Sequence, residues 1–291
     1  MTTGDPVPGR ASRPLRVQAF DGARLAGRAD EAVVEEPLEI RVIVAEDGLP
    51  RASTIAVTMR TPGHDIELAT GFLLAEGVVD DASRIARVEH AVAAAPEARG
   101  NIVLAELVAG ASFDAARFAR NVLMTSSCGI CGRTSIEAVN RAIRTPLAPG
   151  PVVDARTLVG LPARLAERQG TFARTGGLHA AASIRADGTI DLVREDVGRH
   201  NALDKLVGAL AASGRLPASE TIALVSGRAG FELVQKALVA GFPVLAAIGA
   251  PSSLAVALAA RHGMTLIGFL REGRFNIYCC ATRVRAPGTA G

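Results

Sequence analysis

The sequence predicts an α/β protein, with a helix-covered sheet in its second half and a smaller α+β portion before it. Three observations support this prediction. Apolar runs typical of strands alternate with segments of helical spacing from residue 180 onward, glycine-bearing turns separate them, and 49% of the 291 residues are hydrophobic. A chain of this length forms one large domain or two modest ones.

The second half of the chain shows the alternation most clearly. Short apolar runs predict strands at residues 180–184, 190–194, 222–225, 244–248 and 265–270. Longer segments with helical spacing predict helices at residues 199–212, 230–240 and 252–261. Ligands of such sheets bind beside the carboxyl ends of the strands, and we therefore expect a site in the turns that follow them.

The first half of the chain predicts smaller elements. Strands are expected at residues 33–44, 53–59, 87–92 and 102–108, and helices at residues 65–76, 134–143 and 154–167. Thr134 and Glu137 form a capping box, and Asp154 is the expected N-cap of the third helix.

Three portions are expected along the chain. Residues 1–14 are rich in glycine, proline and arginine, which predicts a disordered tail. Residues 15–150 form the N-terminal α+β portion, and residues 151–291 form the α/β core. The proline-rich stretch 145–151 is the candidate linker between them.

Composition and charge exclude several classes of protein. The net charge is +3, spread along the chain, which suits an anionic small ligand better than a nucleic acid. The most apolar stretch, residues 244–260, is interrupted by glycine, proline and serine, so no membrane span is predicted. The start of the chain lacks an apolar signal core, which predicts a cytoplasmic protein. Lys205 and Lys236 are the only lysines; base composition explains their scarcity, yet each lies in or just after a candidate binding turn.

Cys128 and Cys131 form a Cys-x-x-Cys motif in the serine- and glycine-rich loop 126–133. Sulfur chemistry needs a thiolate, and a second thiol, a cation and a helix N-terminus each lower the thiol pKa, to between about 3.5 and 7.5. Arg133 and the helix predicted from Thr134 supply the last two features. In a persulfide carrier, one cysteine holds the terminal sulfur and the second releases it by forming a disulfide.

Three other interpretations of this motif are weaker. A thioredoxin-type exchanger carries its motif near the chain start, after the first strand of a βαβ unit, whereas this motif lies in mid-chain. A zinc or iron–sulfur site would need the remaining cysteines, Cys279 and Cys280, and adjacent cysteines chelate poorly. An inert buried pair does not fit the polar loop. The spacing favours sulfur or redox chemistry over a metal site by a modest margin, and no permanently bound metal is expected.

Two glycine-bearing turns at predicted strand ends suit a phosphate. Ser226, Gly227 and Arg228 follow a strand and open a helix, although for this tripeptide alone an ordinary strand-to-helix turn is the favoured interpretation. Residues 195–205 are denser in polar groups: Arg199 and His200 begin a helix there, and Asp204 shares the helix face of His200. That density favours a functional interpretation.

Two further turns have a similar composition. Residues 175–179 place two glycines before His179, a residue that alone is more often structural than catalytic. The strand predicted at residues 265–270 is linked to a short final strand by a turn in which two arginines flank a glycine. This turn fits either a nucleotide or pyrophosphate site or a charged hairpin. Its residues are Phe269, Leu270, Arg271, Glu272, Gly273 and Arg274.

Taken together and in order, these motifs resemble those of the formate dehydrogenase accessory sulfurtransferase family (FdhD). The matching segments span nearly the whole chain apart from its N-terminal tail. They are residues 35–40, 61–65, 71–73 with 76–77, 126–132, 175–179, 195–205, 226–228, 250–251 and 269–278. Each segment is weak alone, and their ordered combination is specific.

The resemblance implies a cytidine-deaminase-like α/β/α core and a homodimer. It implies that sulfur is accepted from a cysteine desulfurase and passed to the bis-guanine-dinucleotide molybdenum cofactor, a bound substrate required by formate dehydrogenase. Cys128 is then the persulfide carrier and Cys131 the assisting thiol. The family's cofactor-binding segment corresponds to residues 269–274, and we expect the guanine nucleotide there and at residues 226–228, with Arg199 and His200 nearby.

One pair of residues departs from the resembled family, and one alternative activity is disfavoured. Cys279 and Cys280 stand where the resembled family usually has other residues, and no role is assigned to them. Deamination is disfavoured, because no histidine is followed two residues later by glutamate and Ser127, rather than proline, precedes Cys128. Besides sulfur transfer, a dithiol oxidoreductase and a non-catalytic nucleotide-cofactor chaperone remain open from the residues alone.

Overall fold

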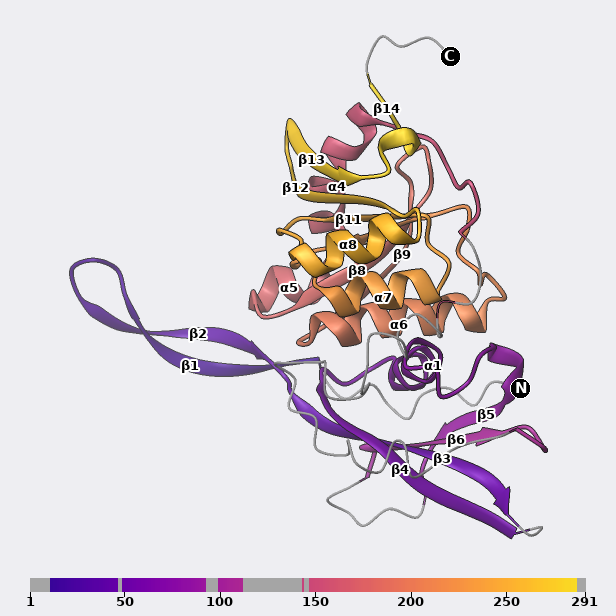
Figure 1. The fold of residues 1–291 in the computed structure, drawn as a ribbon. Coiled ribbons are helices and arrows are strands. Elements are labelled where there is room, and N and C mark those ends of the chain that lie inside the picture. The colour runs from indigo at the N-terminus through magenta and orange to yellow at the C-terminus, as the bar shows by residue number, and fades with distance from the viewer. Residues whose placement is uncertain (1–10, 47–48, 93–98, 112–142, 144–146, 287–291) are drawn as a thin grey trace.

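The computed structural model describes residues 11–46, 49–92, 99–111, 143 and 147–286. Within them, a six-stranded sheet with helices on both faces stands beside a four-stranded sheet and a projecting two-stranded ribbon (Figure 1). The predicted α/β class is confirmed in this mixed form.

The large sheet has the strand order β13-β12-β11-β10-β8-β9. Three inner strands run parallel: β10 (Ile222–Val225), β11 (Val244–Ala247) and β12 (Thr265–Arg271). Antiparallel neighbours flank them on both sides: β8 (His179–Ile184) with β9 (Ile190–Asp196), and β13 (Arg274–Cys279). All five strands predicted from their apolar runs are confirmed, with ends that shift by one or two residues where they differ.

Helices cover both faces of this sheet. One face packs against α6 (Arg199–Ala212), α7 (Phe231–Val239) and α8 (Ser253–Arg261), and the opposite face packs against α4 (Ala155–Arg168). Side chains of each strand alternate between the two faces, so Leu224 lies in the cluster with α4 and its neighbour Val225 lies in the cluster with the other helices. The three predicted helices of this half are confirmed. Asp154 caps α4 through a 2.8 Å hydrogen bond from the amide of Arg156, as predicted.

The small sheet has the order β4-β3-β6-β5. Its strands are β3 (Glu36–Glu46), β4 (Leu49–Arg60), β5 (Ile85–His90) and β6 (Ile102–Leu107). The strand predicted at residues 33–44 was therefore placed with the wrong start. Strand β2 (Leu25–Val33) ends at Val33, and β3 begins at Glu36.

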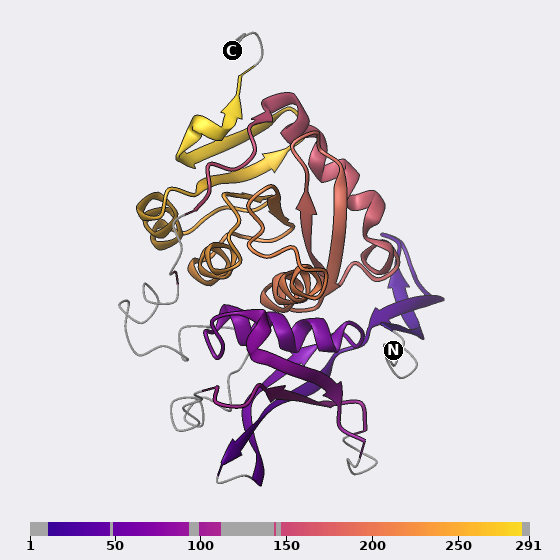
Figure 2. The ribbon, with the colours of Figure 1, turned by 90° about the vertical axis from the view of Figure 1, so that its right-hand side faces the viewer.

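Helix α1 (Asp65–Ala75) lies between the small sheet and α6 (Figure 2). A Cβ added to Gly71 would lie 1.9 Å from the carbonyl oxygen of Asp204, and one added to Gly208 would lie 1.9 Å from that of Glu67. The two helices therefore approach more closely than any side chain at these positions would permit. Apolar residues of the small sheet, α1 and α6 form one continuous cluster, so the two expected portions share a core.

The ribbon consists of β1 (Ser12–Phe20) and β2 (Leu25–Val33), paired in antiparallel register and extending away from the body (Figure 1). Its first strand begins inside the stretch 1–14 that was expected to be a disordered tail, so that expectation is wrong for residues 12–14. They pair with β2 through main-chain hydrogen bonds that composition does not reveal.

Short elements complete the described chain: α5 (Gly170–Thr175), the paired strands β7 (Val153–Asp154) and β14 (Val284–Arg285), and the 3₁₀ turns Ala82–Arg84 and Ala281–Arg283. The helix predicted at residues 134–143 lies outside the described residues, apart from its last position. Among the helices that the structure describes, none has the length and apolarity needed to cross a membrane.

Candidate functional site

The carboxyl ends of the three parallel strands meet at one edge of the large sheet. Beyond β10 and β11, the amide of Gly249 donates a 3.0 Å hydrogen bond to the carbonyl of Gly227. Beyond β11 and into β12, the amide of Phe269 donates a 3.0 Å hydrogen bond to the carbonyl of Gly249. The turn at Gly249 thereby joins two candidate segments, 226–228 and 269–274. Arg228, the end of the first, and Phe269, the start of the second, lie 41 positions apart in the chain.

The antiparallel strands bring two more predicted segments to the same edge. His179, at the start of β8, pairs with Asp196 at the end of β9. A Cβ on Gly227 would lie 3.4 Å from Nδ1 of His179 and 3.8 Å from Cβ of Arg199. The structure therefore brings together His179, Arg199 and the turn around Gly227. The strand ends led us to expect the turns after β9 and β10 here, whereas His179 precedes its strand and reaches this edge because β8 runs antiparallel to β10.

Three helices begin at this edge and direct their N-termini toward it. Gly198 is the N-cap of α6 and Gly230 that of α7, and neither supplies a side-chain cap. Ser252 caps α8 through its hydroxyl, which accepts a hydrogen bond from the amide of Ala255. Helix N-termini carry partial positive charge and amide hydrogens suited to an anion.

Arginines reinforce the positive potential of the edge. Arg228, Arg271 and Arg274 are exposed and Arg199 is partly buried. Within the residues that the structure describes, no carboxylate lies at ion-pair distance from any of these four, whereas Arg60 and Arg194 elsewhere are clamped by carboxylates. Planar guanidinium groups without a carboxylate partner suit phosphate oxygens.

The two histidines of the edge differ in their surroundings. His200 Nε2 lies 2.9 Å from a carboxylate oxygen of Glu232 in the first turn of α7. Burial lowers the pKa of His179, and the positive charges of Arg199 and His200 lower it further. His179 is therefore neutral at physiological pH, and its imidazole can both donate and accept a hydrogen bond.

The segment 269–274 does not offer all its side chains to a ligand. Leu270 was predicted as a cofactor-binding residue, but it is fully buried in the cluster beneath α4 and offers no accessible surface to a ligand. Phe269 is 39% exposed and adopts φ +50°, in the left-handed region that non-glycine residues rarely occupy. Gly273 has φ +76° and forms the turn between β12 and β13, where Glu272 is also exposed.

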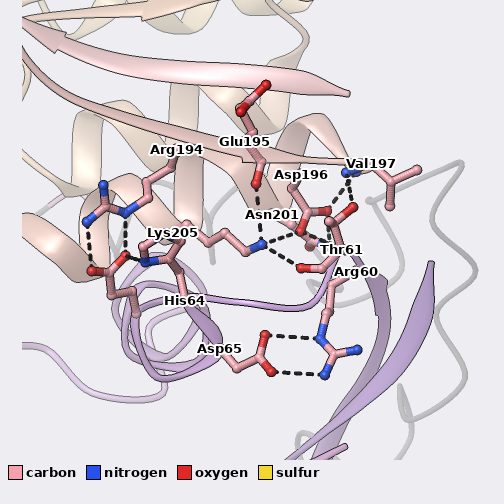
Figure 3. Close-up of polar contacts among 12 residues, drawn as sticks. Arg60, Thr61, His64, Asp65, Arg194, Glu195, Asp196, Val197, Asn201 and Lys205 are labelled. Carbon is pink, nitrogen blue, oxygen red and sulfur yellow. Dashed lines mark hydrogen bonds and ion pairs between the residues drawn. The ribbon is translucent and has the colours of Figure 1, made fainter. Parts of the chain in front are cut away.

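A buried polar network fixes the start of α6 against the turn between β4 and α1 (Figure 3). Lys205 Nζ lies 2.7 Å from Asp196 Oδ2, and the same carboxylate oxygen accepts a 3.1 Å hydrogen bond from the amide of Thr61. Asn201 Nδ2 donates to the other oxygen of Asp196 and to the carbonyl of Met59. The sequence indicated the motif around Lys205, but it did not indicate that Thr61 would bond to Asp196. The only signal for Thr61 was its place in the family-like segment 61–65.

A second polar cluster lies at the start of α1 (Figure 3). Arg194 donates hydrogen bonds of 2.5 and 2.8 Å to the two oxygens of Glu67, and His64 Nδ1 lies 3.3 Å from the same carboxylate. Burial would raise the pKa of Glu67, but hydrogen bonds and charge from Arg194 and His64 outweigh it and lower the pKa to about 2. His64 itself has φ +58°.

Comparison with known proteins identifies the relationship. A family model described as the FdhD/NarQ family matches residues 33–285. The chain belongs to this family. Among similar relatives, a sulfur carrier protein FdhD from Streptomyces coelicolor is 46% identical over 287 residues, which is 97% of this chain and 99% of the relative. Another of the same name, from Mycolicibacterium paratuberculosis, is 47% identical over 272 residues, or 92% and 97% of the two chains.

A crystal structure from Desulfotalea psychrophila, described provisionally as that of a formate dehydrogenase accessory protein, has the same fold. It superposes with a TM-score of 0.70 at 20% identity, covering 94% of this chain and 100% of the other. At this identity the likeness concerns the fold.

The cysteines separate into two groups. Cys128 and Cys131, on which the sulfur chemistry is predicted, lie outside the described residues. Cys279 and Cys280 are partly buried free thiols, and Cys279 Sγ donates a 3.3 Å hydrogen bond to the carbonyl of Met264. Burial and the adjacent Cys280 raise the pKa of Cys279 to about 11. Cys279 is thus a protonated, poorly nucleophilic thiol at neutral pH.

Proposed function

We propose that this chain is a cytoplasmic, homodimeric sulfurtransferase that carries sulfur as a persulfide on Cys128. It takes the sulfur from a cysteine desulfurase and delivers it to the bis-guanine-dinucleotide molybdenum cofactor that formate dehydrogenase uses. The observation that carries this proposal is the similarity, at 46% identity over nearly the whole chain, to proteins named sulfur carrier protein FdhD. Part of the proposal is that the three-layered core shares the cytidine deaminase fold.

The sulfur steps balance with two thiols. The thiolate of Cys128 attacks the outer sulfur of the desulfurase persulfide, and the desulfurase cysteine leaves as a thiolate. For release, the thiolate of Cys131 attacks Sγ of Cys128, and the terminal sulfur departs as sulfide while a disulfide forms between the two cysteines. The terminal sulfur gains the two electrons that the cysteines lose, and a thiol reductant then restores the dithiol.

The cofactor substrate would lie at the carboxyl edge of the large sheet. Its phosphates would be held by Arg228, Arg274 and the helix N-termini, with Arg199 and His200 beside them. The half-exposed ring of Phe269 would stack on a planar ring of the ligand. Supporting this assignment are the four arginines without carboxylate partners in the described chain and the backbone bonds that join the turns.

Intact mass measurement separates sulfur transfer from dithiol exchange. After incubation with a desulfurase and cysteine, the proposed carrier gains one or more sulfur atoms, and a thiol reductant removes them. A dithiol oxidoreductase would instead lose two hydrogens and gain no sulfur. Only the second result in the wild-type chain would refute the carrier function.

Calorimetry with GDP tests the binding edge. Replacing Arg228 and Arg274 together by alanine should weaken GDP binding by at least about tenfold, since each contributes a charge-assisted hydrogen bond. Arg185→Ala is the matched control, because Arg185 is exposed, pairs with Asp191 and lies just beyond the opposite end of β8. Equal GDP affinity in the double variant and the control would reject the assignment.

A further inference from the structure

The two lysines of this chain are both buried and both paired with a buried aspartate. Lys205 and Lys236 are 1% and 4% exposed. Lys205 Nζ lies 2.7 Å from Asp196, and Lys236 Nζ lies 2.9 Å from Asp204. The pairs are similar in burial and chemistry, but they hold different parts of the fold.

Lys205 joins the end of β9 to the turn between β4 and α1. Besides Asp196, its ammonium donates hydrogen bonds to the carbonyl of Thr61 at 2.8 Å and to that of Glu195 at 3.3 Å. An ammonium group has three N–H donors, and all three are used. Lys236 has another task, because its ammonium bonds Glu76 and Asp204 and so links α7 to α6 and to the end of α1.

Hydrogen bonds from two directions hold the turn that follows Asp196. The amide of Gly198 donates to Asp196 Oδ1 at 2.8 Å. The amide of Val197 donates to the hydroxyl of Thr61 at 3.2 Å (Figure 3). Arg199 and His200 come directly after this turn. Their positions at the sheet edge therefore depend on contacts with the N-terminal portion of the chain.

We propose that Thr61 and Lys205 are positioning residues of the anion-binding edge, which act by fixing the turn 196–198 so that Arg199 and His200 face the ligand. This inference rests on the proposed function for its ligand. A buried ion pair often stabilises a fold no more than well-packed apolar side chains would. When all its hydrogen bonds are made, however, it holds the local backbone in one conformation. In this protein the Lys205–Asp196 pair holds the turn 196–198, which directly precedes Arg199 and His200.

The experiment compares Lys205→Met with Lys236→Met at a temperature where both variants are folded by circular dichroism. Each variant leaves one buried aspartate without its lysine, so both should lose stability. GDP affinity, measured by calorimetry, should fall by about tenfold or more in Lys205→Met and by less than about twofold in Lys236→Met. Amide hydrogen exchange of residues 195–200, measured by mass spectrometry, should accelerate in Lys205→Met alone.

A milder pair guards against loss of folding. Thr61→Val keeps the side-chain shape and removes the hydroxyl that accepts from Val197, and it should weaken GDP binding and speed exchange at the same turn. Thr221→Val is its control, because Thr221 is also buried but precedes β10 at the opposite end of the strand from Ser226. Equal effects within each pair, on both affinity and exchange, would overturn the proposal.

The two readouts separate this inference from the proposed function. If wild-type protein fails to bind GDP while the turn loosens selectively in Lys205→Met and Thr61→Val, the nucleotide assignment fails and the positioning of the turn stands. If the wild type binds GDP through Arg228 and Arg274 while the variants match their controls, the positioning role fails and the binding edge stands.

Discussion

The amide of Phe269 donates a 3.0 Å hydrogen bond to the carbonyl of Gly249, whose own amide donates to the carbonyl of Gly227. Main-chain pairing thus continues past the ends of β10 and β11 into the turns. These turns form one backbone surface, and a change in any of them should be transmitted to the others.

Gly249→Ala should disrupt this surface. The added Cβ would lie 2.9 Å from the backbone of Arg228 and from the carbonyl oxygen of Gly227, a distance that requires the backbone to move. We expect a loss of about 1–3 kcal/mol in the free energy of unfolding and clearly weaker GDP binding. Chemical denaturation and calorimetry measure the two effects. Gly160→Ala in α4, on the opposite face of the sheet, is the control, since the Cβ it would add meets only a side-chain nitrogen of Arg164 at 3.9 Å. Equal behaviour of the two variants would contradict the prediction.

Phe269 should show a conflict between binding and stability. Its φ of +50° costs about 1–3 kcal/mol for a non-glycine residue, and its exposed ring is the proposed stacking surface. Phe269→Ala and Phe269→Gly should both lose about tenfold in GDP affinity, because a stacked base contributes about 1–3 kcal/mol. Only the glycine variant is relieved of strain, so it should melt at a higher temperature than the alanine variant. Wild-type affinity in both variants would exclude the stacking role.

The Arg194–Glu67–His64 cluster predicts a pH dependence of stability. The pKa of Glu67 falls from 4.5 to about 2 on folding, so the folded state favours the charged carboxylate. Its contribution to stability is complete above pH 4.5 and is lost as the pH falls toward 2. Denaturant titrations from pH 6 to pH 3 should show a smaller acid-induced loss of stability in Glu67→Gln than in wild type. If the free energy of unfolding fell equally with pH in both proteins, Glu67 would not contribute to the pH dependence of stability.

Cys279 should react slowly despite its partial exposure. A pKa of about 11, against 9.0 for an ordinary thiol, leaves about a hundredfold less thiolate near neutral pH. In the Cys128→Ala/Cys131→Ala variant, alkylation of Cys279 by iodoacetamide at pH 8 should be correspondingly slow in the native protein and fast in denaturant. Peptide mass spectrometry follows this residue separately from Cys280. A native rate equal to the denatured rate would remove the grounds for excluding Cys279 as a carrier.

Much of the large sheet could be predicted because its signals are local. Residues 199–212 and 222–225 match α6 and β10, since helical spacing and a short apolar run are read within a few residues. The ribbon of β1 and β2 was missed, although Asp21-Gly22 between alternating residues is a hairpin signal and Gly22 adopts φ +95°. Its strands bury little apolar surface, so the pattern of hydrophobic residues is weak there.

The site was predictable only in its parts. The turns that follow β9 and β10 were visible at the ends of their strands, and the parallel strands β10, β11 and β12 bring their carboxyl ends to one edge. That His179 joins them depends on the antiparallel course of β8, which the sequence does not show. The hold of Thr61 on Asp196 was not predictable, because it joins residues 135 positions apart and arises from the packing of α1 on α6. The burial of Leu270 depends on a bulge between β12 and β13 that the sequence does not mark.

Transfer of radiolabelled sulfur from a cysteine desulfurase tests the carrier role itself. The wild-type chain should acquire label from labelled cysteine and lose it to a thiol reductant, and the Cys279→Ala/Cys280→Ala variant should behave in the same way. The Cys128→Ala/Cys131→Ala variant should acquire none. Full labelling of that last variant would contradict the persulfide mechanism.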